Sequence, residues 1–294
     1  MPENTKCSSD TSCGTCGTAE SCDAADRARH TEENLQDKLS KIKYRIAVMS
    51  GKGGVGKSTV AVNLAVALAR SGRSVGLFDA DVHGPNVPKM LGIDHMVPSM
   101  GINGMSPVMA TDNLKVISMA FLIEDPDTPV VWRGPMKHSL FQQFLSDVDW
   151  GPLDYLVVDL PPGTGDEPLS IAQLLGQPLW AIIVTTPQDV ALLDSRKSVI
   201  FARTLEMKTL GIVENMSGLV CPHCSGKIDL FKTGGGVRSA AELGVPLLGV
   251  IPIDPQIVTG GDAGVTIESI DPLGFSAEAF RELARQVETV IWQG

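Results

Sequence analysis

The sequence lacks an excess of positive charge. Its 24 lysine and arginine residues stand against 34 aspartate and glutamate residues, which gives a formal net charge of -10. A surface of this sign repels the phosphate backbone of DNA or RNA, whereas nucleic-acid binding needs a basic face. We therefore expect no nucleic-acid partner.

The sequence also lacks a long apolar run. No stretch approaches the roughly 18 apolar residues of a membrane span, and the N-terminus has no basic start followed by an apolar run and a small-residue cleavage site. We therefore expect a cytoplasmic protein without a membrane partner. A predicted amphipathic helix at residues 276–292 does not change this expectation, because the glutamates on its polar face disfavour anionic lipid.

Aromatic and branched apolar side chains are scarce at the N-terminus, where Ser, Thr, Asp and Glu are abundant. Such a segment cannot bury a core of its own. We predict a largely flexible arm over residues 1–41 and ordered structure from about Ile42. Residues 42–294 suffice for one substantial α/β domain, since 43% of the chain is hydrophobic.

Apolar runs typical of buried parallel strands alternate with helical patterns along this domain. Strands are predicted at residues 44–49, 75–78, 155–158, 181–184, 210–213 and 247–251. Helices are predicted at residues 57–70, 136–148, 169–175, 190–205, 237–243 and 276–292. The alternation predicts an α/β fold, a P-loop NTPase with a mostly parallel sheet covered by helices on both faces.

The eight-residue phosphate-loop pattern lies between the first predicted strand and the helix that follows it. Its glycines let backbone N–H groups turn toward phosphates, and the helix N-terminus adds partial positive charge. Lys57 would reach the β- and γ-phosphate oxygens, and the Ser58 hydroxyl would bind Mg²⁺. The expected nucleotide ligands are Gly51, Lys52, Gly53, Gly54, Val55, Gly56, Lys57, Ser58 and Thr59.

Acidic residues follow two of the predicted strands, at the edge where ligands bind in such sheets. Asp79 and Asp81 follow the second strand, and Asp159 follows the third. A carboxylate near the γ-phosphate can coordinate Mg²⁺ through water or orient the attacking water. Asp81 and Asp159 are candidates for these roles, with Ser58 as a further magnesium ligand, although an aspartate after a strand can instead cap a helix.

The six cysteines fall into two groups. The predicted arm carries Cys7, Cys13, Cys16 and Cys22, and an insertion near residues 216–234 carries the C-x-x-C pair Cys221 and Cys224. In a reducing compartment this clustering favours thiolate metal ligands over disulfides. Two thiolates make half of a tetrahedral or four-iron site, whereas four complete one and would supply folding energy to the arm. Zinc or an iron-sulfur cluster fits each group, and a redox disulfide is a further alternative for the pair.

Four motifs together closely resemble the Mrp/ApbC group of iron-sulfur cluster carrier ATPases. They are the loop at residues 51–59, Asp79-Ala-Asp-Val-His-Gly-Pro-Asn86, Trp132-Arg-Gly-Pro-Met136 and Val158-Asp-Leu-Pro-Pro-Gly-Thr-Gly-Asp166. The last motif is the most specific, because a simple phosphate-loop enzyme does not need two prolines followed by Gly-Thr-Gly. The resemblance covers about residues 42–292.

This resemblance implies ATP as the nucleotide and assigns roles to several residues. Lys52 matches the extra lysine of deviant Walker A ATPases, which in that group reaches across a homodimer interface to the partner's nucleotide. Asp81 would position the nucleophile, and Asp159 would be the Walker B residue behind Ser58. A lysine on a loop can also be merely solvated.

The resemblance also implies a pocket for the adenine base. Asn215 ends a strand where this superfamily reads the base, and the segment from Pro252 to Asp254 resembles the loop that closes the base pocket. Asparagine is common at strand ends for turn reasons alone, so a structural role for Asn215 is the alternative.

For the cysteines, the resemblance implies a 4Fe-4S cluster bridging two subunits, with the C-x-x-C pair contributed by each chain. The arm resembles the extension of the eukaryotic cytosolic scaffold members, whose last three cysteines share the spacing of Cys13, Cys16 and Cys22. A second 4Fe-4S cluster within one chain is implied there. The gap after Cys7 is much shorter than in those members, so the ligand role of Cys7 stays open.

The sequence thus predicts an ATP-dependent scaffold or carrier whose homodimer interface binds a cluster and releases it to apo-proteins. An electron-transfer ATPase like the nitrogenase iron protein is one alternative, but it would keep single, widely separated cluster cysteines. A positioning ATPase of the septum-site or partition kind shares the extra lysine, but it would interact with membrane or DNA. A zinc-stabilised regulatory ATPase is the third alternative.

Overall fold

The computed structural model describes residues 24–102, 104–122, 134–221, 224 and 226–293. A central sheet of eight strands has the order β12-β9-β8-β1-β7-β2-β6-β5. Its strands are β1 (Ile42–Met49), β2 (Val75–Asp79), β5 (Val108–Thr111), β6 (Leu114–Ser118), β7 (Leu153–Asp159), β8 (Leu179–Thr185), β9 (Lys208–Glu214) and β12 (Leu247–Val250). Every neighbouring pair is parallel except β5 with β6, which is antiparallel.

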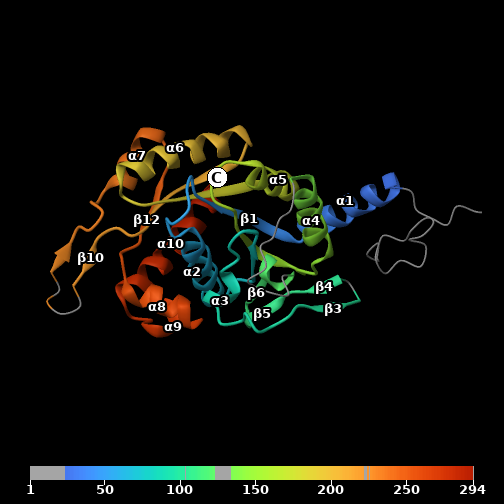
Figure 1. Ribbon diagram of the computed structural model, residues 1–294, viewed down its shortest axis with the longest axis horizontal. Coiled ribbons are helices and arrows are strands. Elements are labelled where there is room, and N and C mark those ends of the chain that lie inside the picture. The colour runs from blue at the N-terminus through green and yellow to red at the C-terminus, as the bar shows by residue number, and fades with distance from the viewer. Residues whose placement is uncertain (1–23, 103, 123–133, 222–223, 225, 294) are drawn as a thin grey trace, which may run out of the picture.

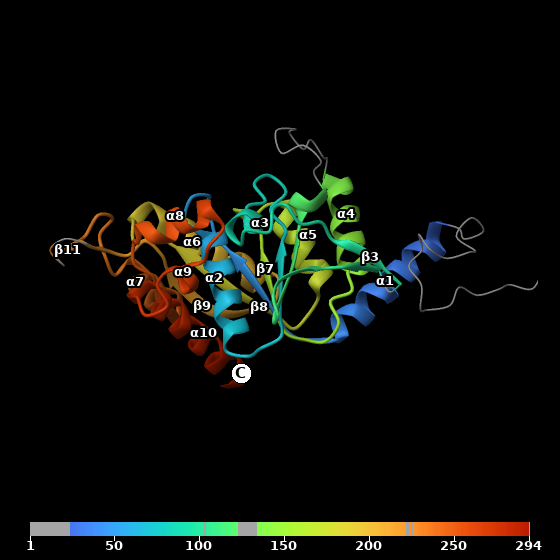
Figure 2. The same ribbon diagram turned by 90° about the horizontal axis from the view of Figure 1, so that it is seen from below.

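Helices cover both faces of this sheet (Figures 1 and 2). One face carries α2 (Lys57–Arg70), α3 (Val87–Met90), α8 (Pro255–Ala263), α9 (Ile267–Ile270) and α10 (Phe275–Gln293). The other carries α1 (Ala24–Ser40), α4 (Gly134–Asp147), α5 (Asp166–Leu175), α6 (Asp189–Thr204) and α7 (Gly235–Leu243). Successive residues of a strand point to opposite faces of the sheet and pack in different hydrophobic cores. In β1, Ile46 and Val48 face the first set of helices, and Ala47 and Met49 face the second. The predicted fold class is confirmed.

Two short hairpins project from the layered body. One pairs β3 (Ser99–Gly101) with β4 (Gly104–Ser106), and the other pairs β10 (Leu219–Val220) with β11 (Lys227–Ile228). A 3₁₀ helix, η2 (Met119–Leu122), follows β6. The β10–β11 hairpin carries the C-x-x-C motif, and it lies at the end of the molecule opposite α1 (Figures 1 and 2). Within the described ranges, no helix is both long and apolar enough to span a bilayer.

Helix α1 corrects the expectation that residues 1–41 form a flexible arm. Leu35 and Leu39 lie one turn apart on the same side of this helix and are buried, with 0% and 3% of their surfaces exposed. They pack in the same core as Phe141 and Leu145 of α4. The segment cannot form a core alone, but it completes one that α4 and the sheet provide. Residues 1–23, with the four arm cysteines, lie outside the described residues.

We predict that Leu35→Ala lowers the free energy of unfolding by about 2–5 kcal/mol, because it deletes a fully buried side chain and leaves a cavity. Leu273→Ala is the matched control, since Leu273 is 94% exposed, and its effect should stay within about 0.5 kcal/mol. Urea unfolding of both variants measures the difference. Equal stabilities would show that α1 does not belong to the folded core.

Candidate nucleotide site and cysteine hairpin

The phosphate loop connects the carboxyl end of β1 to the first turn of α2. Gly56 is the N-cap of α2 with φ 79°, and Gly54 has φ 78°, a left-handed conformation that favours glycine. Among the residues that the structure describes, no side chain caps α2, and its first turn has no acidic residue. The N–H groups of that turn therefore remain available to an anion such as phosphate.

Two close contacts fix the phosphate loop against the rest of the fold. A Cβ atom on Gly51 would collide with the backbone of Asp194 in α6, and one on Gly56 would collide with the side-chain amide of Asn215. In contrast, a Cβ on Gly53 would meet nothing within 4 Å. The phosphate loop thus packs against α6 and against the end of β9, while Gly53 at its tip has free space around it.

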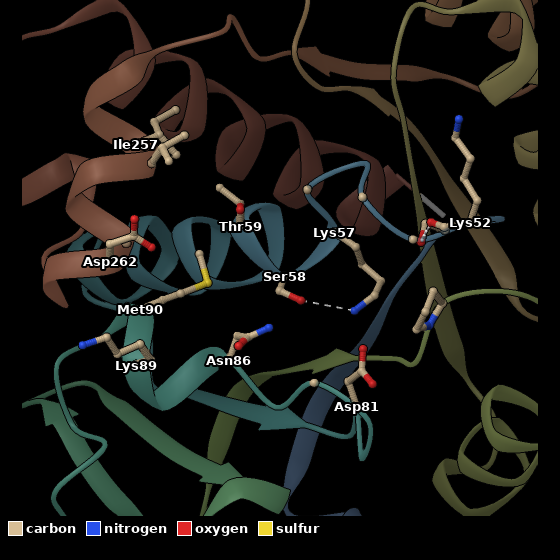
Figure 3. A pocket seen from close by; sticks show the side chains of 18 residues that line it. Lys52, Lys57, Ser58, Thr59, Asp81, Asn86, Lys89, Met90, Ile257 and Asp262 are labelled. Atoms are coloured by element: carbon tan, nitrogen blue, oxygen red, sulfur yellow. Dashed lines mark hydrogen bonds between the residues drawn. The ribbon is translucent and has the colours of Figure 1, made fainter. Parts of the chain in front are cut away.

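The loop borders a cavity of about 520 Å³ (Figure 3). Predicted residues that line it are Ser58, Thr59, Asp81, Lys52, Gly53, Gly54, Gly56 and Lys57. The opposite wall comprises Asn86, Lys89, Met90, Ile257 and Asp262, which the sequence analysis did not select. Asn86 ends one of the quoted motifs and could have been found by that signal. The others belong to α3 and α8, which carry no recognisable motif. The side chain of Lys52 extends away from Lys57 (Figure 3).

Lys57, which lines this cavity, forms a buried ion pair with Asp159, which does not line it. The Lys57 Nζ lies 2.5 Å from Asp159 Oδ1 and 3.4 Å from Ser58 Oγ. Burial raises the pKa of Asp159, and the Lys57 ammonium opposes this shift. The other oxygen, Asp159 Oδ2, is buried and has no hydrogen-bond partner among the described residues. A buried carboxylate oxygen beside a serine hydroxyl fits a magnesium-nucleotide, because Mg²⁺ prefers oxygen ligands.

Asp79 is fully buried beside Asp159, and it organises the loop that carries Asp81. Its Oδ1 accepts a hydrogen bond from the Asp81 backbone N–H at 3.2 Å, and its Oδ2 accepts from the Ser118 hydroxyl at 2.8 Å and the Val87 N–H at 3.2 Å. Burial, together with the nearby Asp159 charge, raises the pKa of Asp79 to about 8. Asp79 thus positions the loop, while Asp81 itself lines the cavity.

His83, Lys137 and Glu167 form a polar cluster that joins three of the quoted motifs. His83 Nε2 lies 3.0 Å from Glu167 Oε1 and 3.1 Å from Lys137 Nζ, and Lys137 also pairs with Glu167. Burial raises the pKa of Glu167, but the hydrogen bonds from Lys137 and His83 outweigh burial and hold it below its usual range. No sequence pattern predicted this cluster, although Lys137 and Glu167 each directly follow a motif.

The residues predicted to bind the base are not gathered in the cavity at the phosphate loop. The Asn215 amide donates a hydrogen bond to the Val55 carbonyl at 2.9 Å, so it contacts the loop backbone. Pro252 and Asp254 line a separate cavity of about 450 Å³. Asp254 caps the N-terminus of α8 and also accepts a hydrogen bond from Ser276 at 2.6 Å. Base binding by these residues stays a prediction.

The cysteine pair lies on the β10–β11 hairpin. Cys221 is half-buried, Cys224 is exposed, and both are present as thiols. The backbone N–H of Cys221 donates to the Gly226 carbonyl at 2.9 Å, which closes the turn of the hairpin. In the described part of the chain, no group of three or more His, Cys, Asp and Glu side chains could hold a metal ion. Two thiolates by themselves make half of a four-ligand site.

Comparison with known proteins decides the family. Residues 41–288 match the family described as ParA: NUBPL iron-transfer P-loop NTPase. The chain belongs to this NUBPL family. The resemblance to the Mrp/ApbC carriers is thereby confirmed for the NTPase domain. The arm cysteines Cys7, Cys13, Cys16 and Cys22 lie outside the matched residues.

Relatives of this NUBPL-family chain are named iron-sulfur cluster carrier proteins. The protein of Methanocaldococcus jannaschii is 47% identical over 87% of this chain and 88% of its own length. That of Saccharolobus solfataricus is 49% identical over 87% of each chain. A nucleotide-binding protein of Archaeoglobus fulgidus, solved in complex with ADP, superposes with a TM-score of 0.73 at 38% identity, covering 83% of this chain and 96% of its own. The cell-division ATPase MinD of Pyrococcus furiosus reaches 0.64 at 27% identity, covering 84% and 99%.

Proposed function

We propose that this chain is an ATP-dependent iron-sulfur cluster carrier that transfers its cargo to recipient apo-proteins in the cytoplasm. The observation that carries the proposal is the position of Cys221 and Cys224 on a projecting hairpin, directly after the strand whose end seats the phosphate loop. Relatives named as carriers are 47% and 49% identical to the chain, against 27% for a cell-division ATPase. This difference favours a carrier over a positioning ATPase.

The nucleotide site has the groups that phosphoryl transfer to water requires. Lys57 would bind the β- and γ-phosphate oxygens, and Ser58 and Asp159 would hold Mg²⁺, which neutralises phosphate charge. Asp81 lines the same cavity and would orient the attacking water. The free N–H groups at the start of α2 support binding of the phosphates.

The number of cysteines on the hairpin supports a homodimer. A 4Fe-4S cluster takes four thiolates, and the hairpin supplies Cys221 and Cys224. We therefore infer that a second copy of the chain supplies the other two. Lys52 would act across this dimer on the nucleotide of the partner, which agrees with a side chain that extends away from Lys57.

Anaerobic reconstitution with iron and sulfide tests the proposed cargo. The protein should take up a 4Fe-4S cluster with its visible absorption, and Mg-ATP should accelerate transfer of that cluster to an apo-ferredoxin. Nucleotide-free protein is the control. A colourless protein that holds stoichiometric zinc would identify the zinc-stabilised alternative and refute the carrier function.

Lys52→Ala is expected to leave ATP affinity nearly unchanged and to slow hydrolysis by about 100-fold or more, because a cation acting on transition-state charge is removed. Lys43→Ala is the matched control, since Lys43 is exposed and its ammonium pairs at the surface with Asp154. Steady-state phosphate release measures both variants.

Mixing variants tests the trans role of Lys52. A heterodimer of Lys52→Ala with Asp81→Asn has one complete site only if Lys52 serves the opposite chain. We expect the mixture to regain part of the hydrolysis that each variant lacks alone. A mixture as inactive as its components would place Lys52 in its own site.

A further inference from the structure

Glu214 is a buried carboxylate that no step of the proposed reaction uses. It ends β9, and 1% of its surface is exposed. Its oxygens accept three hydrogen bonds: Oε1 from the Ser217 hydroxyl and from the Gly234 N–H, the latter at 3.2 Å, and Oε2 from the Gly236 N–H. Hydrogen bonds to a buried charge are among the stronger ones in proteins.

These three donors lie at the two ends of the segment that carries the cysteines. Ser217 precedes the β10–β11 hairpin, and Gly234 and Gly236 follow it at the start of α7. One carboxylate therefore closes the whole insertion into a loop. The N-terminus of α7 also favours a negative charge at this point, because its first N–H groups carry partial positive charge.

The glycines after the hairpin allow the chain to pass close to Glu214. Gly234 has φ 76°, which favours glycine. A Cβ on Gly236 would approach the Glu214 Cβ to 2.8 Å, and one on Gly235 would approach the Pro187 carbonyl oxygen to 2.5 Å. A larger residue at Gly236 would therefore push the start of α7 away from Glu214.

The residue after Glu214 holds the phosphate loop. The Asn215 side chain donates to the Val55 carbonyl at 2.9 Å, and its backbone N–H donates to Thr185 at 2.8 Å. Adjacent residues thus contact the nucleotide loop and the cysteine hairpin. The Glu214 carbonyl accepts from the Ile251 N–H at 2.8 Å, so this strand end is also fixed to the loop after β12.

We propose that Glu214 is a positioning residue that couples the phosphate loop to the cysteine hairpin. A nucleotide that orders the phosphate loop also restrains Asn215, which contacts that loop. The adjacent Glu214 is then held in place as well, and its hydrogen bonds restrain both ends of the hairpin segment. The physical basis is a set of hydrogen bonds at two adjacent residues, from Asn215 to the phosphate loop and from the hairpin segment to Glu214, and a coupling measurement must test it. The proposal deepens the carrier function and rests on it.

Hydrogen exchange of the metal-free, full-length protein provides a readout that is independent of the cluster. In the wild type, Mg-ADP should slow exchange in peptides covering residues 217–221 and 234–236. In Glu214→Gln these peptides should exchange about tenfold faster and no longer respond to Mg-ADP, because the amide cannot accept all three hydrogen bonds. Glu242→Gln is the matched control, since Glu242 lies on α7 and pairs at the surface with Arg196.

Activity measurements separate coupling from a general loss of structure. Glu214→Gln should hydrolyse ATP within about threefold of the wild type and transfer its cluster at the nucleotide-free rate, without acceleration by ATP. A Glu214→Gln variant that keeps the exchange response to Mg-ADP, or that loses hydrolysis and transfer together, overturns the proposal.

Ser217→Ala removes a single hydrogen-bond donor to Glu214, and it replaces Glu214→Gln in the exchange experiment if that variant does not fold. In Ser217→Ala the same peptides should exchange about threefold faster than in the wild type. Unchanged exchange would contradict the role of Glu214 in holding the hairpin.

The two proposals fail in different ways. If wild-type protein takes up no cluster but its hairpin responds to Mg-ADP through Glu214, the carrier function fails and the coupling stands. If the cluster binds and is transferred but Glu214→Gln behaves as the wild type in exchange, only the coupling fails.

Discussion

Lys57→Ala is expected to abolish detectable ATP hydrolysis and to weaken ATP binding by about 100-fold or more. Lys57 is the buried cation of the phosphate loop, with 6% of its side chain exposed. Its removal deletes the charge that would meet the β- and γ-phosphates. It also leaves the Asp159 carboxylate buried without its partner, 2.5 Å away in the structure. Breaking such a pair costs about 3–5 kcal/mol of stability, so the variant should also unfold more easily.

A second substitution separates the two effects of Lys57→Ala. Adding Asp159→Asn removes the uncompensated carboxylate, so the double variant should recover most of the lost stability in urea unfolding. It should not recover ATP binding, because the cation is still missing. Binding is measured by titration with a fluorescent ATP analogue. ATP hydrolysis retained by Lys57→Ala would refute the nucleotide site.

Replacing Cys221 and Cys224 together by Ala is expected to reduce cluster transfer to an apo-ferredoxin by about 100-fold or more, since the hairpin then has no thiolate ligand. The fold should be little affected, because Cys221 is half-buried and Cys224 exposed on the projecting hairpin, and neither belongs to the two hydrophobic cores beside the sheet. ATP binding should persist, because neither cysteine lines the cavity at the phosphate loop.

The arm cysteines must be removed to make this test decisive. Cys7, Cys13, Cys16 and Cys22 could hold a cluster of their own, so the substitutions are made in a background with these four replaced by Ser. The background alone is the matched control and should still take up iron at the hairpin. Equal iron uptake and transfer with and without the hairpin cysteines would locate the cargo elsewhere.

Local patterns in the sequence were enough to predict most of the central fold. Buried parallel strands are continuous apolar runs, so β1, β2, β7, β8, β9 and β12 could be recognised. Helix α2 begins at Lys57 and ends at Arg70, as predicted, because the phosphate-loop glycines precede it and Gly72, with φ 88°, follows it. The phosphate loop and Asp81 could be identified for the same reason, as short motifs beside such strands.

The remaining features depend on contacts between distant segments. Leu35 and Leu39 become core residues only because α4 lies beside them, and the polar composition of α1 conceals this. Asp254 precedes a proline after a strand, a pattern that fits a helix N-cap as well as a base contact, and the structure places it at the N-cap of α8. The hydrogen bonds from Gly234 and Gly236 to Glu214 join residues about twenty positions apart, and no local sequence pattern predicts them.

We propose that two copies of this chain share one cluster through their hairpins. Native mass spectrometry of the anaerobically reconstituted protein, with the four arm cysteines replaced by Ser, tests it most directly. We predict a dimer that carries a single 4Fe-4S cluster and dissociates into monomers when Cys221 and Cys224 are also replaced. A monomer that holds a complete cluster, or a dimer with one cluster or one zinc ion in each chain, would contradict the account.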